Sequence, residues 1–300
     1  MGNNLDKLPK GEPVNFPFAK RLDVEKNPKK NYYIQYFNDI ARAGPIEKQF
    51  LAAQVIDLFK TSFATVENFD YVISYYFYFA NANTIDLLFM VDKTTQLPIG
   101  FSLSLIIEEY LEPGNFRDEN KYFITKGLVG INPEYRKGGL YKDLAIASAY
   151  LNSTKYKNHN FIIFDLVISP AVFHTVHKFG EWIYPGPGKQ INNKQLEFML
   201  RLRKSFLLNP ISESNPLLVH ATTYLRASEK EYWRRDYNKL NSEMKYHIDQ
   251  TQLTKNVGLL YMLVANLVEG NTFGLPAKFY LPSFKPDFEI YEHTFLSPKL

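Results

Sequence analysis

The chain has 300 residues, of which 45% are hydrophobic and 22% charged, and its net charge is +4. This composition suits one large domain or two small ones and excludes a disordered polyelectrolyte. The absence of Cys excludes disulfides, thiolate nucleophiles and Cys-ligated metals. The N-terminus lacks the apolar core of a secretory signal, and the longest apolar runs, residues 71–80 and 257–268, are too short to span a bilayer. We therefore expect a cytoplasmic protein without a membrane partner.

The first part of the chain predicts an arm, a strand, a helix and a hairpin. Residues 1–30 are polar and rich in Pro and Lys, which is typical of an extended or poorly ordered arm. Residues 31–37 predict a first strand, and from Pro45 apolar residues recur at helical spacing. Residues 62–83 fit a helix or a strand equally well. The apolar runs 84–92 and 99–111 flank a turn and predict a hairpin.

The middle of the chain alternates predicted strands and helices. Residues 122–131 predict a third strand, and a helix follows at about 139–151. Residues 161–168 predict a fourth strand, Ser169-Pro170 opens a short helix that ends near Gly180, and residues 182–184 form a brief strand. In the first of these helices one apolar face is formed by Leu140, Leu144, Ala147 and Leu151.

The C-terminal part is less regular. Residues 194–208 predict a helix, residues 217–225 a strand and residues 228–250 a charged helix, whereas the apolar run 257–268 fits either type. No internal repeat is present. We divide the chain into an arm at residues 1–30, a domain at 31–190 and a helical or mixed extension at 191–300.

The segment NPEYRKGGLYKDL, residues 132–144, joins a predicted strand to a helix through paired glycines. Several N–H groups are unpaired at such a helix start, and the helix dipole adds partial positive charge. Gly138 and Gly139 allow close approach to a ligand, and Arg136 and Lys137 attract phosphate. This pattern favours a diphosphate site. The alternative is a tight turn with two solvated cations.

Two common phosphate-binding motifs are absent, namely the Walker loop and the G-x-G-x-x-G fingerprint. Residues 131–141, INPEYRKGGLY, instead fit R-x-x-G-x-[GA] after a V-x-P-x-x start. With the element order over residues 85–185, this segment resembles the GNAT-type N-acyltransferase superfamily. Tyr141 stands where the motif has a small residue, and Lys137 where a glycine is often found. The resemblance implies an α/β (α+β) fold with a mixed, mainly antiparallel central sheet flanked by helices.

The resemblance also implies a ligand, since this segment grips the pyrophosphate of acyl-CoA in the superfamily. We therefore expect acetyl-CoA, or another acyl-CoA, as co-substrate and no metal. Arg136 and Gly139 match the arginine and the helix-start glycine of the motif. A backbone N–H at residues 129–131 would hold the thioester carbonyl oxygen. The expected cofactor-binding residues are Val129, Ile131, Arg136, Lys137, Gly138, Gly139, Leu140 and Tyr141.

Catalytic candidates follow from the same resemblance. The family often places an acidic Tyr on the helix after the next strand, but residues 170–179 contain none. His174 and His177 are the substitutes there, with surface histidines as the alternative and no further metal ligand close in sequence. Glu108 and Glu109 are candidate bases, and at most one of them can line the cleft because adjacent strand residues point to opposite faces. Asp165 is an unusual carboxylate inside an apolar strand, and could orient substrate or make a structural hydrogen bond.

Two functions fit these features. The first is an N-acyltransferase that moves acetyl from acetyl-CoA to an amine of a small molecule or a protein. The second is a non-catalytic acyl-CoA-binding or sensing module on the same fold. Nucleic acid is not an expected partner, because the Arg and Lys residues of the C-terminal part fit solvated helix faces. Residues 191–300 could complete the sheet, wall the acceptor site or form a homodimer.

Overall fold

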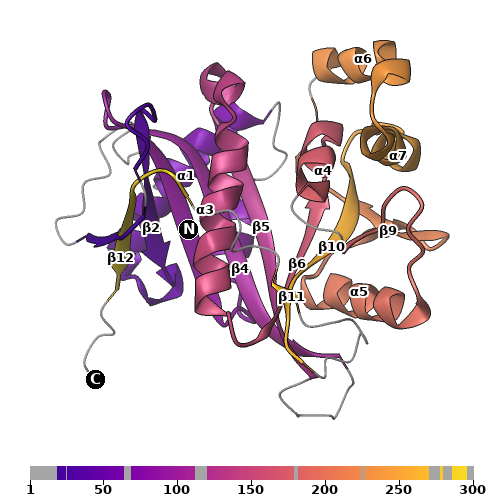
Figure 1. Ribbon diagram of the computed structural model, residues 1–300, viewed down its shortest axis with the longest axis horizontal. Helices are drawn as coiled ribbons and strands as arrows, with labels where there is room; N and C mark the ends of the chain where they lie inside the picture. The colour runs from indigo at the N-terminus through magenta and orange to yellow at the C-terminus, as the bar shows by residue number, and fades with distance from the viewer. Residues whose placement is uncertain are drawn as a thin grey trace.

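The computed structural model describes residues 19–24, 26–63, 69–111, 120–178, 182–223, 225, 227–269, 278–279 and 286–295. Twelve strands in these ranges form one sheet in the order β1-β12-β2-β3-β4-β5-β6-β10-β9-β8, with β7 and β11 also paired to β10 (Figure 1). The strands are β1 (Lys20–Leu22), β2 (Tyr32–Asn38), β3 (Thr84–Asp92), β4 (Pro98–Tyr110), β5 (Lys121–Ile131), β6 (Asn160–Val167), β7 (Ile183–Tyr184), β8 (Pro210–Ser212), β9 (Asn215–His220), β10 (Val257–Leu267), β11 (Lys278–Phe279) and β12 (Ile290–Thr294).

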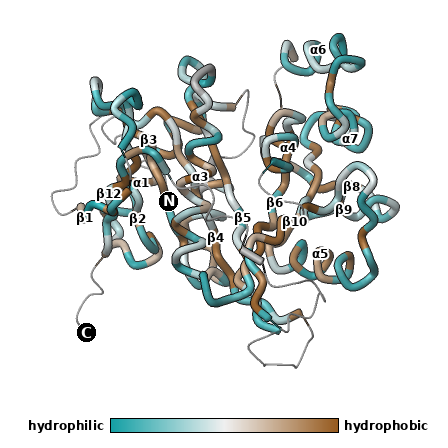
Figure 2. The backbone as a smooth tube through the Cα atoms, viewed as in Figure 1, coloured by the Kyte–Doolittle hydropathy of each residue, from teal (hydrophilic) through white to brown (hydrophobic). Residues whose placement is uncertain are grey.

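Helices cover both faces of this sheet. They are α1 (Pro45–Ser62), α2 (Phe69–Phe77), α3 (Leu140–Lys155), α4 (Pro170–His177), α5 (Asn193–Ser205), α6 (Ala227–Arg235) and α7 (Ser242–Thr251), with 3-10 helices η2 (Ile40–Arg42), η4 (Pro133–Gly138) and η5 (Tyr237–Lys239). In Figure 2 the most apolar segments follow the central strands, whereas α6 and α7 are mostly hydrophilic.

Two apolar clusters separate the faces of the sheet. On β5, Tyr122 and Ile124 join the large cluster that includes α1 and α2, whereas Ile131 joins the cluster beneath α3. This division follows from the alternation of side chains along a strand. The predicted face of α3 is confirmed, because Leu140, Leu144, Ala147 and Leu151 are all buried against the sheet.

The predicted elements of the domain are confirmed with small shifts at their ends. The hairpin pairs β3 with β4 from Thr84↔Ile106 onward. The ambiguous residues 62–83 contain α2, while residues 64–68 lie outside the described ranges. The short helix after β6 ends at His177, and the expected end near Gly180 falls on residues that are not described. Of the expected arm, residues 1–18 are not described, and Lys20–Leu22 form β1.

The prediction of one helix over residues 228–250 is wrong. Helix α6 ends at Arg235, η5 follows, and Leu240 has extended backbone before α7 begins. The physical reason is a new helix start, because the Asn241 side chain accepts a hydrogen bond from the Met244 N–H and caps α7. The strand expected at residues 217–225 is β9, which already ends at His220.

The apolar run 257–268 is a strand, β10, and it extends the sheet beyond β6. It pairs antiparallel with β6 from Leu259↔Val167 to Asn266↔Phe161. On the opposite edge β12 lies between β1 and β2 and runs parallel to β2. Parallel pairing thus occurs at β12–β2 and β5–β6, and the remaining ladders in the described ranges are antiparallel.

The fold is therefore the expected mixed, mainly antiparallel sheet flanked by helices, and the C-terminal residues contribute strands to that same sheet. The division at residue 190 stays a prediction. None of the helices in the described ranges combines the length and apolar content that crossing a bilayer requires.

Candidate functional site

The central feature of the fold is a wedge between the two parallel strands β5 and β6. They pair only from Tyr122↔Asn160 to Thr125↔Ile163. Beyond this point β5 stays paired with β4 and β6 stays paired with β10, so the two strands part (Figure 1). A cavity of about 570 Å³ occupies the wedge. Its walls come from β5, β6, the ends of α1 and α4, α2, α6 and residues 207–209, 220–223 and 225.

The edge of β5 that faces β6 turns backbone groups into this wedge. The Gly127 N–H donates to Asp165 at 3.2 Å, and the Gly127 C=O accepts from the Tyr76 hydroxyl at 2.9 Å. Successive residues of a strand direct their N–H and C=O to alternate sides, so Val129 and Ile131 point the same way as Gly127. The Ile131 C=O accepts from Arg136 Nε at 3.3 Å. The two expected residues Val129 and Ile131 both line the cavity.

The turn after β5 carries the predicted anion motif. Gly139 has a φ of +75°, the left-handed region that favours glycine, and a Cβ there would meet no atom within 4 Å. Helix α3 begins at the next residue, and Asp143 N–H is the first to bond within the helix, to the Gly139 C=O at 3.3 Å. Helix α3 starts at Leu140, so the N–H groups of its first turn, residues 140–142, have no intrahelical acceptor, which is the arrangement an anion requires.

The other motif residues have different roles. Arg136 lines the cavity and donates to the Ser62 C=O at the end of α1, and its guanidinium lies 3.6 Å from Glu229 of α6. Tyr141 also lines the cavity, whereas the Leu140 side chain is buried between α3 and the sheet. Lys137 and Gly138 belong to η4, and their side chains and surroundings are not described. The backbone of the turn thus offers more to an anion than the Arg136 charge, which protein groups already share.

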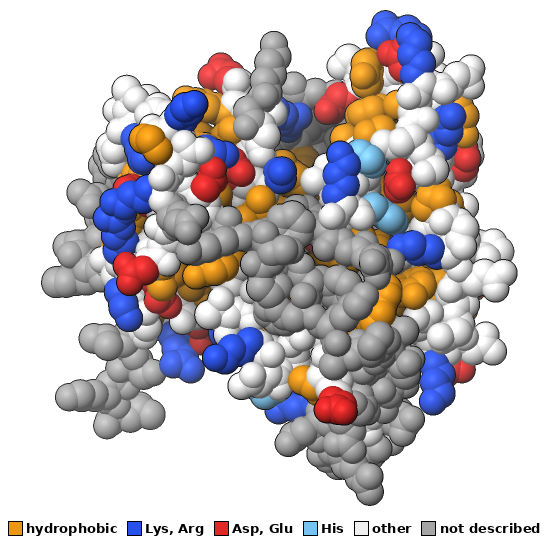
Figure 3. Space-filling view, in the orientation of Figure 1, with side chains coloured by type: hydrophobic (Ala, Val, Ile, Leu, Met, Phe, Trp, Pro, Cys, Tyr) orange, Lys and Arg blue, Asp and Glu red, His pale blue; other side chains and the backbone are white. Residues whose placement is uncertain are grey.

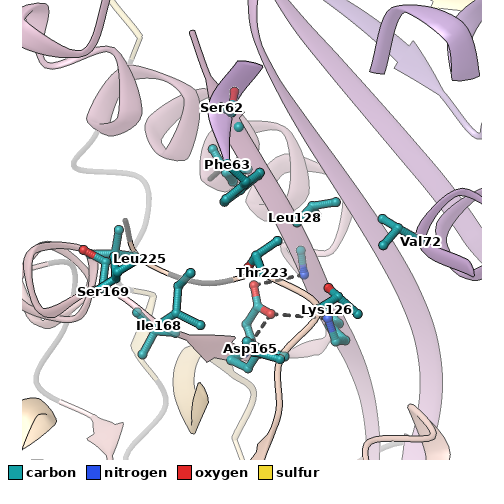
Figure 4. A pocket seen from close by; sticks show the side chains of 18 of the residues that line it. Ser62, Phe63, Val72, Lys126, Leu128, Asp165, Ile168, Ser169, Thr223 and Leu225 are labelled. Carbon is teal, nitrogen blue, oxygen red and sulfur yellow. Dashed lines mark hydrogen bonds and ion pairs between the residues drawn. The ribbon is translucent and has the colours of Figure 1, made fainter. Parts of the chain in front are cut away.

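A polar cluster lies at the narrow end of the cavity (Figure 4). Lys126 Nζ, with only 3% of its side chain exposed, lies 3.6 Å from Asp165 and donates to the Tyr76 hydroxyl at 2.6 Å. Asp165 also accepts from the Leu166 N–H at 2.8 Å. Burial raises the pKa of Asp165, and the Lys126 charge and the two backbone donors oppose that shift only in part. Asp165 is therefore the carboxylate in this cluster with a perturbed proton affinity.

Tyrosines surround this carboxylate. Burial, and to a lesser degree the negative charge of Asp165, raise the pKa of Tyr76, of Tyr141 and of Tyr261, so that all three stay protonated at neutral pH. All three line the cavity. Lys126 was not among the sequence-predicted residues, although a lysine inside an otherwise apolar strand is a usable signal of such a cluster.

The three predicted catalytic residues lie away from this cluster and are absent from the described lining of the cavity. Glu108 forms an ion pair with Lys121 at 2.8 Å. Burial pushes its pKa up, but hydrogen bonds from Lys121 and Tyr110 outweigh that effect and lower the pKa below its ordinary value. Such a carboxylate is a weak base.

The two α4 histidines are half-buried, and Figure 3 shows histidine side chains that reach the surface over α4. His174 Nδ1 lies 3.4 Å from the Glu243 carboxylate of α7. His177 Nδ1 lies 2.8 Å from the Phe173 C=O, and burial lowers its pKa. Within the described ranges no three His, Asp or Glu side chains gather as a metal ion would need.

No family model and no curated protein sequence matches the chain. Solved structures do match, at low similarity. A mutant spermidine/spermine N-acetyltransferase SpeG from Vibrio cholerae is 14% identical with a TM-score of 0.32, over 57% of this chain and 98% of that one. NAA60 from Arabidopsis thaliana, in complex with acetyl-CoA, is 12% identical with a TM-score of 0.33, over 77% of this chain and 98% of that one.

The order of elements carries weight for the fold. A hairpin, a strand that parts from its parallel neighbour, a glycine-bearing turn, a helix, a strand, a short helix and a brief strand follow one another as the resemblance implies. The chain therefore has the mixed, mainly antiparallel sheet flanked by helices that the resemblance implies.

Proposed function

We propose that the protein is an acyl-CoA-dependent N-acyltransferase, in the simplest case one that transfers acetyl from acetyl-CoA to an amine. The observation that carries the proposal is the continuity of one cavity. It is lined by the open edge of β5 at Val129 and Ile131, by Arg136 of η4 and by Tyr141 at the start of α3. An extended thioester attached to a diphosphate has the shape to occupy both.

The open edge of β5 suits the extended arm of such a ligand. Amide groups of an extended chain bind an exposed strand edge as an added strand does. From Gly127 to Ile131 the edge measures about 13 Å at roughly 3.3 Å per residue. Asp165 and Tyr76 occupy both backbone groups of Gly127 and Arg136 occupies the Ile131 C=O, so the ligand's amides would pair with Val129 and with the Ile131 N–H. With its diphosphate on the N–H groups around Gly139, the ligand's arm runs along this edge toward Lys126 and Asp165.

The chemistry needs a polarised carbonyl and a neutral amine. The N–H of Val129 or Ile131 supports the carbonyl oxygen as negative charge develops on it. An alkyl ammonium has a pKa of about 10, so the acceptor must lose a proton before attack. The thiolate leaves readily, because thiols have pKa values of about 8.5, and an acid therefore has little to add.

The test is in two stages. Calorimetric titration with acetyl-CoA measures binding, and we expect saturation at one site per chain. Incubation with acetyl-CoA and a panel of amines then measures free thiol, and we expect release that depends on the amine. Failure to bind acetyl-CoA would contradict the proposal. A titration with desulfo-CoA serves as a control for recognition of the diphosphate without the thioester.

A non-catalytic acyl-CoA-binding module is the second candidate. It is favoured by the positions of Glu108, His174 and His177, which are engaged with other groups and do not line the cavity. Acetyl-CoA binding without thiol release across the panel would support this module. A cytoplasmic location and a homodimer stay predictions that these assays do not address.

A further inference from the structure

The charges of the cavity wall restrict what an acceptor can be. Among the described lining residues the acidic and basic side chains form two pairs of opposite sign. Lys126 lies 3.6 Å from Asp165, and Arg136 lies 3.6 Å from Glu229. The carboxylates in this part of the lining therefore do not outnumber the basic side chains. An acceptor that carries several ammonium groups would have to bury each of them without an opposite charge, at high cost.

The remaining wall combines a large apolar and aromatic part with the polar side chains of Ser62, Ser169, Asn209, His220, Thr222 and Thr223. Tyr71, Val72 and Tyr75 of α2 face the segment after α5 with Leu207 and Leu208 across the cavity. The two sides are joined by a hydrogen bond from the Tyr75 hydroxyl to the Phe206 C=O at 2.8 Å. Two of these apolar side chains are exposed at the rim, Tyr71 at 48% and Leu207 at 62%. Exposed apolar groups around a pocket mark it as a site for an apolar ligand.

Leu207 is an unexpected residue at its position. Helix α5 ends with the Leu207 N–H bonded to the Lys204 C=O and the Leu208 N–H bonded to the Arg203 C=O, both at 2.9 Å. In this helix ending the residue in the left-handed conformation is usually glycine, yet Leu207 has a φ of +55°. A leucine there is strained and exposed. Because the fold would be served better by glycine at this position, we infer that the Leu207 side chain has a role in binding a ligand.

The reacting end of the cavity complements this apolar wall. Asp165 offers a carboxylate whose negative charge burial disfavours, so it accepts a proton more readily than an exposed one. Lys126 beside it disfavours a second positive charge, which promotes the neutral form of an amine. An amine with one nitrogen on an apolar body fits both the apolar wall and the Asp165–Lys126 pair.

We propose that the acceptor is a monoamine with an apolar or aromatic body, which lies against Tyr71, Leu207 and Leu208 while its nitrogen meets Asp165. This inference rests on the proposed acyl transfer. The amine nitrogen bonds to the thioester carbonyl carbon, the C–S bond breaks, and its electron pair leaves with sulfur. The proton lost by the nitrogen passes to Asp165 and from there to the thiolate, so that an amide and a thiol result.

The first test compares acceptors. Thiol release from acetyl-CoA is measured with phenylethylamine, with spermidine and with a lysine-containing peptide. We expect kcat/KM for phenylethylamine to exceed that for each of the other two at least tenfold. Equal or better use of spermidine or the peptide would overturn this inference and leave acyl transfer standing. Binding of acetyl-CoA without turnover of any of the three would overturn it as well, whereas loss of acetyl-CoA binding is the failure of the proposed function.

Variants separate the two ends of the pocket. Leu207→Gly removes the rim side chain and also relieves its backbone, so the variant should fold. We expect KM for phenylethylamine to rise about fivefold, while KM for acetyl-CoA is unchanged. Gln252→Gly is the matched control, because Gln252 has a φ of +53° at the end of α7 and is absent from the described lining. An equal effect of the two variants, or no effect of Leu207→Gly, would overturn the assignment.

Asp165→Asn tests the proton acceptor. We expect kcat to fall at least a hundredfold, with acetyl-CoA affinity within threefold of the parent value. The pH profile of kcat/KM should lose its acidic limb. If the variant keeps that limb and full activity, Asp165 is not the proton acceptor. The Leu207→Gly variant then tests by itself whether the apolar wall binds the body of the amine.

Discussion

At the scale of single residues, His247 on α7 is a buried histidine whose pKa is lowered by its surroundings. Its side chain has no exposed area, and Nε2 lies 3.1 Å from the Val167 C=O. Burial lowers the pKa of His247 from 6.5 to about 4, although the hydrogen bond to Val167 opposes the shift. Above pH 6.5 the neutral ring is present in both the folded and the unfolded chain. As pH falls toward 4, only the unfolded chain gains the proton, so stability is lost over that window.

We expect this single group to remove roughly 2 to 3 kcal/mol of the free energy of unfolding between pH 7 and pH 4.5. His247→Gln keeps an N–H donor near Val167 but has no ring to protonate, so the loss on acidification should be smaller by that amount. Denaturant unfolding at the two pH values measures it. The exposed His159, changed to Gln, is the control, and an identical loss for both variants would contradict the assignment.

At the scale of elements, the start of α3 separates helix stability from anion binding. Gly139→Glu and Gly139→Gln carry the same backbone strain, on the order of 1 kcal/mol, because φ is positive at this position. A carboxylate near a helix N-terminus stabilises the helix. The same carboxylate repels a diphosphate. We therefore expect the Glu variant to unfold no more easily than the Gln variant but to lose acetyl-CoA binding in calorimetry, while Gln retains it within about tenfold. Equal affinities would argue against a diphosphate at this turn.

The link between η4 and α6 gives a second element-scale prediction. Glu229 lies 3.6 Å from Arg136, and both side chains are more than a third exposed, so the pair itself adds little stability. It does compete with any anion for the Arg136 charge. Glu229→Gln should therefore raise acetyl-CoA affinity a few-fold at low salt, and the gain should shrink at 0.5 M salt through screening. Glu231→Gln, an exposed neighbour on α6, is the charge-matched control and should show no such gain.

At the scale of the whole molecule, local sequence patterns predicted most helices and strands. They predicted little of which strands pair with each other in the sheet. The spacing of Leu140, Leu144 and Ala147 predicts both α3 and its buried face, because helix periodicity is encoded locally. By contrast, the pairing of β10 with β6 and of β12 with β2 joins segments distant in sequence, and no local pattern specifies it.

The residues of the candidate site likewise fall into those that one sequence segment predicts and those that only the folded structure brings together. Val129, Ile131, Arg136 and Tyr141 were predicted from one continuous segment and do line one cavity. Lys126 and Asp165 meet only because β5 and β6 become neighbours, and Leu207 reaches the rim only because α5 packs beside α2. Glu108 was selected for its strand, yet it lies on the other side of the point where β5 and β6 part, beside Lys121.

The position of β12 has a consequence for how the chain is made. This strand lies beside β2 (Figure 1), and Asn38 donates to Glu292 at 3.4 Å across 254 residues of sequence. During synthesis the outer rim of β2 has no partner until the ribosome has delivered that distant segment. Until then this edge of β2, like the edge of β6 that pairs with β10, is an unpaired ladder through which nascent chains can associate. A holdase that covers this edge until β12 is synthesised should therefore raise the yield of native protein.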